Sequence, residues 1–261
     1  MPGNPRIYLV FPDLGGAKAE ALCRLSRRGF EINVLVSYFI LKTKPITYQR
    51  LISLRDKSCL RNVMLDSGAY HIAFHGLELT PEEYALRAKY LRNHVNLIVG
   101  PDIPRNPEKS IDRMLRFSNI YKDEFIPTLQ SSNLDPEEYL LNLEALEVHG
   151  LLKKAPKVHG GKPLIGIGGL VGAPVETVAN VIDRLKDTCN CFFHLFGANV
   201  RIIKGLARRD LLNKIYSIDT SGWLSDLRWR RRTVYKARDT LEANIKVMIG
   251  YLSKIQKQLL L

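Results

Sequence analysis

The sequence predicts a single (β/α)8 TIM barrel that occupies residues 1–261. Eight short apolar stretches alternate with segments of helical periodicity, and they begin near residues 7, 33, 63, 97, 125, 164, 192 and 215. Successive starts are therefore 23 to 39 residues apart, which is the rhythm of this barrel. No Ser/Gly-rich linker, internal repeat or low-complexity tract interrupts the chain. The alternative is an open, doubly wound sheet, but the Gly166-x-Gly168-Gly169 loop lacks the third glycine of a dinucleotide fingerprint.

In the first half of the chain, each predicted strand is an apolar run that ends at turn-forming or polar residues. These runs are 7–11, 33–38, 63–66 and 96–102. A helix is expected over 18–28, because its periodicity stops at Gly29, a residue typical of helix C-caps. A second helix should begin after Thr80, since Pro81 suits the first helical position and Glu83 completes a capping box.

The second half continues the same alternation. Its predicted strands are 124–130, 163–170, 191–197 and 215–223. Asn106-Pro107 and Asp135-Pro136 each place a capping residue before a proline, so a helix should begin at both sites, and a third should cover 174–186. A basic C-terminal helix over about 226–261 is expected to close the chain.

The composition favours a soluble chain with a polyanionic partner. The formal net charge is +13 and the isoelectric point is about 9.6, which suggests nucleic acid, although such charge also serves solubility. No apolar run approaches the length of a membrane span, and the first residues do not form a signal peptide. A cytoplasmic location without a membrane partner is therefore expected.

Four cysteines are too few for a disulfide scaffold. Cys189 and Cys191, followed by His194, weakly resemble a metal cluster. However, strand alternation would put the two cysteines on one face and His194 on the other. Buried structural thiols are the better interpretation, and no metal site is predicted.

Three acids and an amide follow predicted strands, and a barrel brings all strand ends to one mouth. These residues, with the loops beside them, are Asp66, Gln130, Asp102, Gly168-Gly169-Leu170, Phe196-Gly197 and Asp219. Structural alternatives exist: Asp66 and Asp219 suit helix caps, Asp102 suits a turn, and Gln130 and Phe196 suit a loop or core. Their joint placement favours a catalytic site.

The ordered motifs resemble the tRNA-guanine transglycosylase superfamily, which exchanges guanine in a polynucleotide for a 7-deazaguanine. The motifs are Asp66-Ser67-Gly68-Ala69-Tyr70, Asp102, Gln130, Gly168-Gly169-Leu170, His194-Leu195-Phe196-Gly197 and Asp219. The resemblance implies that Asp219 is a nucleophile that forms a covalent glycosyl intermediate and that Asp66 shuttles protons. It also implies a base-binding set without a cofactor: Ser67, Tyr70, Asp102, Gln130, Gly168, Gly169, Leu170 and Phe196.

The chain departs from the superfamily's tRNA enzymes, because no cysteine follows Asp219 to build their zinc subdomain. The resemblance therefore implies a minimal member that replaces guanine in a polynucleotide with a 7-deazaguanine such as preQ0. It favours DNA over tRNA as that polynucleotide. The alternatives are a zinc-less tRNA enzyme and a non-catalytic, nucleic-acid-binding barrel subunit. A guanine or 7-deazaguanine base is the expected small partner, and accessory proteins or a homodimer are possible further partners.

The C-terminal basic stretch is the predicted nucleic-acid surface. It interleaves an aromatic ring with arginines: Arg228, Trp229, Arg230, Arg231 and Arg232. Arginines neutralise phosphates, and a target guanine in a duplex must leave the stack. The alternative is a solvated basic helix face.

Overall fold

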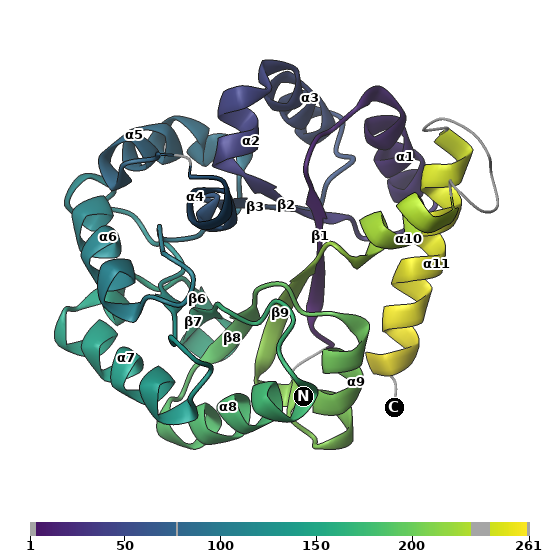
Figure 1. The fold of residues 1–261 in the computed structure, drawn as a ribbon. Helices are drawn as coiled ribbons and strands as arrows, with labels where there is room; N and C mark the ends of the chain where they lie inside the picture. The colour runs from purple at the N-terminus through teal and green to yellow at the C-terminus, as the bar shows by residue number, and fades with distance from the viewer. Residues whose placement is uncertain (1–3, 77, 231–240, 260–261) are drawn as a thin grey trace.

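A closed parallel barrel is the architecture of the computed structural model, which describes residues 4–76, 78–230 and 241–259 (Figure 1). Its strands are β1 (Arg6–Phe11), β2 (Asn33–Ser37), β3 (Asn62–Asp66), β4 (Leu97–Ile98), β5 (Thr128–Leu129), β7 (Lys162–Ile167), β8 (Phe192–Leu195) and β9 (Ile215–Thr220). They pair in the order β4-β3-β2-β1-β9-β8-β7-β5, and a parallel bridge between Val99 and Ile126 joins the two edges. The predicted (β/α)8 fold is confirmed. A short β6 (Lys157–Val158) pairs antiparallel with β7 and was not predicted.

Helices surround the barrel (Figure 1). They are α1 (Gly16–Arg27), α2 (Tyr38–Thr43), α3 (Pro45–Asp56), α4 (Ala69–His75), α5 (Pro81–Leu91), α6 (Pro107–Ile120), α7 (Pro136–Val148), α8 (Val175–Thr188), α9 (Val200–Arg208), α10 (Gly222–Arg230) and α11 (Leu241–Leu259). Three predicted starts are confirmed by their caps, since the side chains of Thr80, Asn106 and Asp135 accept backbone N–H bonds at 3.1, 3.0 and 3.1 Å.

The sequence missed α2, α3, α4 and α9. Helix α3 buries few side chains, so its sequence carries little helical periodicity. Helix α9 does carry an apolar face, Ile202, Ile203 and Leu206, which was overlooked between two clear strands.

The predicted basic helix over 226–261 corresponds instead to α10 and α11, with residues 231–240 outside the described part. Helix α11 packs against α1, α9 and α10 and buries Val247, Met248, Tyr251 and Ile255. It is therefore a wall helix of the barrel, with its apolar face turned inward, and it is not a freely exposed basic surface.

An apolar plug fills the barrel below its mouth. One inward side chain from each of the eight strand positions takes part: Tyr8, Leu35, Met64, Val99, Ile126, Leu164, Phe192 and Tyr216. Each is less than 10% exposed. Because side chains alternate along a strand, the residues two and four positions further on form the next inward layers at the carboxyl ends of most strands, whereas a register irregularity on β9 brings Ser217 and Asp219 inward after Tyr216. The plug is thus the floor beneath any site at the mouth.

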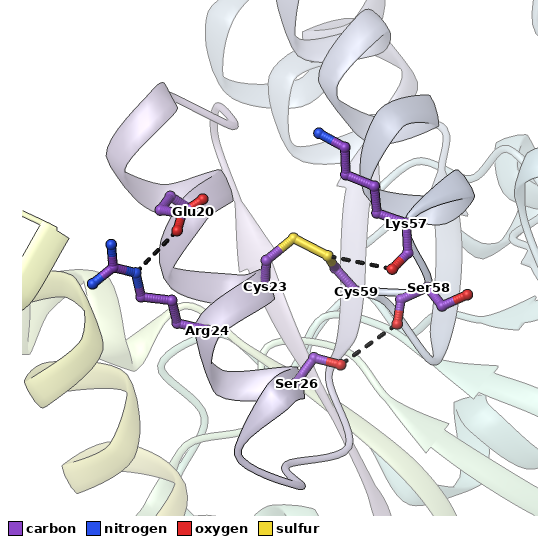
Figure 2. The surroundings of a disulfide bond; sticks show 7 residues. All are labelled: Glu20, Cys23, Arg24, Ser26, Lys57, Ser58 and Cys59. Atoms are coloured by element: carbon purple, nitrogen blue, oxygen red, sulfur yellow. Dashed lines mark hydrogen bonds and ion pairs between the residues drawn. A yellow bond between two sulfur atoms is a disulfide. The ribbon is translucent and has the colours of Figure 1, made fainter.

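A disulfide connects two segments of the outer wall (Figure 2). It joins Cys23 on α1 to Cys59, which follows α3, across 36 residues of sequence. A second disulfide joins Cys189 and Cys191. The expected burial is confirmed for Cys191, whereas Cys189 is half-buried, and the expectation that these two are free thiols is wrong. The partner of Cys23 lies in a segment whose helix was not predicted, so their proximity was not visible in the sequence.

Loss of the Cys23–Cys59 bond should lower stability. A cross-link that closes a loop of this length restrains the unfolded chain and is worth about 4 kcal/mol in the chain-entropy model. We expect Cys23→Ser to reduce the urea midpoint of the oxidised protein, and reduction of the wild type to have a similar effect. Cys189→Ser opens a loop of only two residues and should change the midpoint much less. Equal midpoints for oxidised wild type and Cys23→Ser would contradict a bond that stabilises the wall.

Candidate active site

Three carboxylates meet at the mouth of the barrel, above the apolar plug. Asp66 ends β3, Asp102 follows β4 and Asp219 lies near the end of β9. The charges of Asp102 and Asp219 both act on Asp66, which places the three within electrostatic reach of one another. The predicted convergence of these residues is therefore a feature of the structure, although the roles of the individual residues are not tested by it.

Asp66 is half-buried, and its Oδ2 accepts a 2.8 Å hydrogen bond from the Gly68 N–H. Gly68 has φ +91° and is itself the N-cap of α4, so Asp66 shapes the turn but is not the cap of that helix. Burial, together with the negative charges of Asp102 and Asp219, raises the pKa of Asp66 to about 7. Near neutral pH this carboxyl exists in both protonation states, as a group that exchanges protons requires.

Asp102 is held by an amide. The Gln130 Nε2 donates to Asp102 Oδ2 at 2.6 Å, while Gln130 Oε1 accepts from the Arg105 N–H at 3.1 Å. Gln130 lies over Gly168, whose missing Cβ leaves the space that the amide occupies. Burial raises the pKa of Asp102 to about 6, although the Gln130 hydrogen bond opposes this increase. Asp102 and Gln130, both predicted site residues, thus form one unit.

Asp219 contacts a histidine that the sequence analysis did not place in the site. Its Oδ1 accepts from the Gly197 N–H at 2.8 Å and lies 3.5 Å from His194 Nε2. The His194 Nδ1 is 2.8 Å from Ser217 Oγ. His194 is fully buried, and its ring packs edge-on against Phe196 with centroids 4.4 Å apart. The sequence placed His194 in a weak metal pattern with Cys189 and Cys191 and in the motif His194-Leu195-Phe196-Gly197, but its partners lie 23 and 25 residues further on.

The other predicted contact residues separate into two groups. Phe196 is half-buried at the mouth, and Tyr70 on α4 is 52% exposed and lies edge-on to His71. Leu170 is fully buried in the outer apolar core, and Ser67 is fully buried beside Asp66, so neither offers a surface to a ligand in this conformation. Gly169 has φ +78° and forms the turn after β7.

The predicted nucleic-acid surface is only partly described. Arg228 is exposed on α10, and Trp229 and Arg230 belong to the same helix. Arg231 and Arg232 lie outside the described residues. A role for this basic stretch in nucleic-acid binding remains a prediction, as do a homodimer and accessory proteins.

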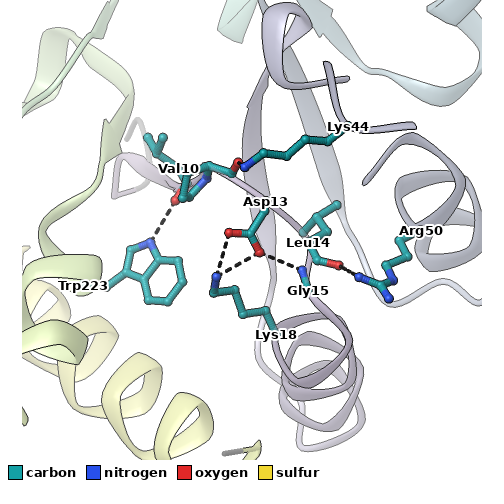
Figure 3. Close-up of polar contacts among 9 residues, drawn as sticks. Val10, Asp13, Leu14, Gly15, Lys18, Lys44, Arg50 and Trp223 are labelled. Carbon is teal, nitrogen blue, oxygen red and sulfur yellow. Dashed lines mark hydrogen bonds and ion pairs between the residues drawn. The ribbon is translucent and has the colours of Figure 1, made fainter. Parts of the chain in front are cut away.

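Polar contacts around Asp13 and Trp223 hold the loop after β1 and the start of α10 in place (Figure 3). Asp13, just after β1, accepts two 2.9 Å hydrogen bonds from Lys18 and one from the Gly15 N–H. Trp223, four residues after Asp219, donates from Nε1 to the Val10 carbonyl at 3.1 Å and packs on Phe11. These contacts fix the β1–α1 loop and tie the β9–α10 turn to β1, which restrains the backbone that carries Asp219.

Within residues 4–76, 78–230 and 241–259, no three His, Cys, Asp or Glu side chains are arranged to hold a metal ion. At the mouth, Asp66, Asp102 and Asp219 each accept a hydrogen bond from a backbone or side-chain amide. No helix in these same ranges is long and apolar enough to cross a membrane.

Comparisons with known proteins give the fold alone. No protein-family model and no curated protein matches the chain. A Coccidioides immitis protein assigned as a fructose-1,6-biphosphate aldolase has a TM-score of 0.59 and 12% identity, covering 98% of this chain and 89% of its own. The YdjI aldolase of Escherichia coli K12 has a TM-score of 0.59 and 11% identity, covering 97% and 90%. Both similarities extend over the whole barrel.

These comparisons contradict the resemblance to the tRNA-guanine transglycosylase superfamily. The two structural neighbours named above carry aldolase names, and no family model matches the chain. The predicted guanine exchange in DNA or tRNA through an aspartyl-glycosyl intermediate is therefore wrong. The physical reason is that Asp66-Ser67-Gly68 and Gly168-Gly169-Leu170 are strand-to-loop transitions, which the geometry of a barrel mouth requires whatever the reaction. That Asp66, Asp219 and the predicted binding residues serve a reaction stays a prediction.

Gly168→Ala should displace Gln130. A Cβ at this position would overlap the Gln130 amide, so the side chain must leave Asp102 or the strands must shift. We expect a loss of roughly 1–3 kcal/mol in the free energy of unfolding, the usual range for overpacking. Gly250→Ala, in α11 with open space around the added methyl, is the control and should be neutral or slightly stabilising. A Gly168→Ala variant as stable as the wild type would contradict the packing of Gln130 on this glycine.

Asp66→Asn should stabilise the protein increasingly as pH rises. The folded pKa of Asp66 is about 7, above its ordinary value of 3.8. The free energy of unfolding therefore decreases as pH increases from about 4 to 7. Asparagine removes this loss, and we expect a gain of roughly 1–3 kcal/mol at pH 8, with little gain at pH 4. Asp183→Asn is the control, because a Lys186 hydrogen bond lowers the pKa of that exposed carboxyl. Thermal melts across pH test this; a gain that does not vary with pH would contradict it.

Proposed function

We propose that the chain is an enzyme of aldolase type, in which the mouth carboxylates act as general acid and base on a hydroxyl-bearing carbonyl compound. The observation that carries the proposal is the Asp66 carboxyl, whose pKa is raised to about 7 at the mouth of the barrel. The names of the two structural neighbours support the reaction class. Their similarity is one of fold, so the activity itself depends on the chemistry of the mouth.

In the cleavage direction, Asp66 in its ionised form would accept the proton of the substrate hydroxyl two carbons from the carbonyl. The carbon–carbon bond then breaks, the former hydroxyl carbon becomes an aldehyde, and the electron pair passes to the other fragment as an enolate. Asp102, in its protonated form, would donate to the carbonyl oxygen and stabilise that charge. The proton taken by Asp66 returns to the enolate carbon, so the two products together have the composition of the substrate.

The environment of the two carboxyls suits these roles. Burial raises the pKa of Asp102 to about 6, which retains a protonated fraction in mildly acidic to neutral solution. Gln130 fixes Asp102 Oδ2, and the Gly68 N–H fixes Asp66 Oδ2, so both groups are oriented before a substrate arrives.

Two assays test the proposal. The first follows aldehyde release from fructose 1,6-bisphosphate and from unphosphorylated fructose; the second uses NMR to follow deuterium exchange next to the carbonyl of dihydroxyacetone and its phosphate. Asp66→Asn should reduce the wild-type rates by about 10²–10⁴-fold, the usual contribution of a general base. The rate should pass through a maximum between about pH 6 and 7, because Asp66 must have lost its proton while Asp102 must retain its own.

Asp183→Asn, which changes an exposed carboxylate on α8, is the control and should keep the wild-type rate. Absence of cleavage and exchange with all four compounds would overturn the aldolase-type reaction. Full activity in Asp66→Asn would instead show that the base lies elsewhere.

A further inference from the structure

His194 is enclosed between two oxygen-bearing side chains of β9. Its ring is fully buried, with Nδ1 2.8 Å from Ser217 Oγ and Nε2 3.5 Å from Asp219 Oδ1. Within the described part of the chain, Nε2 has no partner of hydrogen-bond geometry. Phe196, the residue after β8, packs edge-on against the His194 ring. The ring is therefore enclosed, and its Nε2 lies 3.5 Å from a carboxylate oxygen without a hydrogen bond.

The chemistry of the two partners decides where a neutral ring carries its proton. A serine hydroxyl donates or accepts, but an ionised carboxylate only accepts. A proton on Nδ1 would turn the lone pair of Nε2 toward Asp219, which is repulsive. A proton on Nε2 gives the attractive charge pairing with Asp219 Oδ1, 3.5 Å away, and a small shift of either group completes the hydrogen bond; the Ser217 hydroxyl then donates to Nδ1. Only this second arrangement satisfies both contacts.

Asp219 Oδ1 would then be held from two directions. The Gly197 N–H already donates to this atom at 2.8 Å, and the left-handed φ of +71° at Gly197 aims that amide. With His194 on the same oxygen, the carboxylate is prevented from rotating. Its Oδ2 accepts no hydrogen bond that the described residues make.

We propose that His194 is a positioning residue, which carries a proton on Nε2, directs it to Asp219 Oδ1 and so presents Asp219 Oδ2 to a reactant. The consequence for catalysis rests on the function proposed above, but the tautomer does not. The titratable groups that face this pair are Tyr8 on β1, whose ring lies edge-on to His194, and Asp66 across the mouth. Neither contacts a nitrogen of the ring.

Long-range 1H–15N NMR of protein labelled at histidine tests the tautomer without an activity assay. The chain has six histidines, and the signal that is missing in His194→Gln identifies His194. At pH 8 we expect the wild type and Ser217→Ala to show the Nε2–H form, because Asp219 is unchanged in both. Asp219→Ala should lose this preference. A predominant Nδ1–H form in the wild type, or an unchanged Nε2–H form in Asp219→Ala, would overturn the proposal.

Two substitutions of His194 separate positioning from simple packing. His194→Gln can place an amide N–H near the position of Nε2, whereas His194→Asn reaches only the position of Nδ1. In the assays above, we expect His194→Asn to lose about 100-fold in kcat with little change in KM, the scale of a misplaced reacting group, while His194→Gln recovers much of it. Melting curves of both variants control for folding. Equal losses in two equally folded variants would contradict the proposal, and an inactive wild type leaves the NMR result decisive.

Discussion

The filled interior of the barrel is the constraint on which the site depends. Eight inward side chains close the lumen, from Tyr8 on β1 to Tyr216 on β9, so no solvent reaches the mouth from below. The alternation of each strand then turns the next inward residues, Asp66 and His194 among them, toward one another in a layer with water on a single side. Carboxylates placed there lose hydration and repel one another, and both effects raise the pKa of Asp66. The chemistry of the mouth is thus a consequence of how the core is packed.

Two glycines, Gly166 in β7 and Gly168 just after it, leave space that neighbouring side chains of the site occupy. A Cβ on Gly166 would meet the ring of Phe196, and one on Gly168 would overlap Gln130. Phe196 follows β8 and packs against His194, whereas Gln130 follows β5 and donates a hydrogen bond to Asp102. β7 lies between these two strands. The absence of side chains at Gly166 and Gly168 therefore leaves room for Phe196 and Gln130, which orient His194 on one side of β7 and Asp102 on the other. A methyl group on either glycine would disturb the site without touching a carboxylate.

The sequence predicted the barrel because its strands carry two strong signals, a short apolar run and a polar residue at its end. The same signals located Asp66, Asp102 and Asp219 correctly at one mouth. Interactions between distant positions were not predictable: Cys23 and Cys59 are 36 residues apart, and His194 meets Ser217 from the neighbouring strand. The family resemblance failed for a related reason. Asp66-Ser67-Gly68 reports how a strand turns into a loop, and this local geometry is shared by barrels that perform unrelated reactions.

The overall charge and the local charge of the mouth act at different distances. The chain carries a net charge of +13, but charges separated by more than about 8 Å are largely screened at physiological ionic strength. The positive excess therefore influences encounter with an anionic partner more than it influences the reacting groups. At the mouth, burial and the charges of Asp102 and Asp219 raise the pKa of Asp66, which favours uptake of a proton by this carboxyl. A strongly basic composition is thus compatible with a site whose reactivity depends on carboxyl groups, so that the charge of the whole chain is a poor guide to the chemistry at its centre.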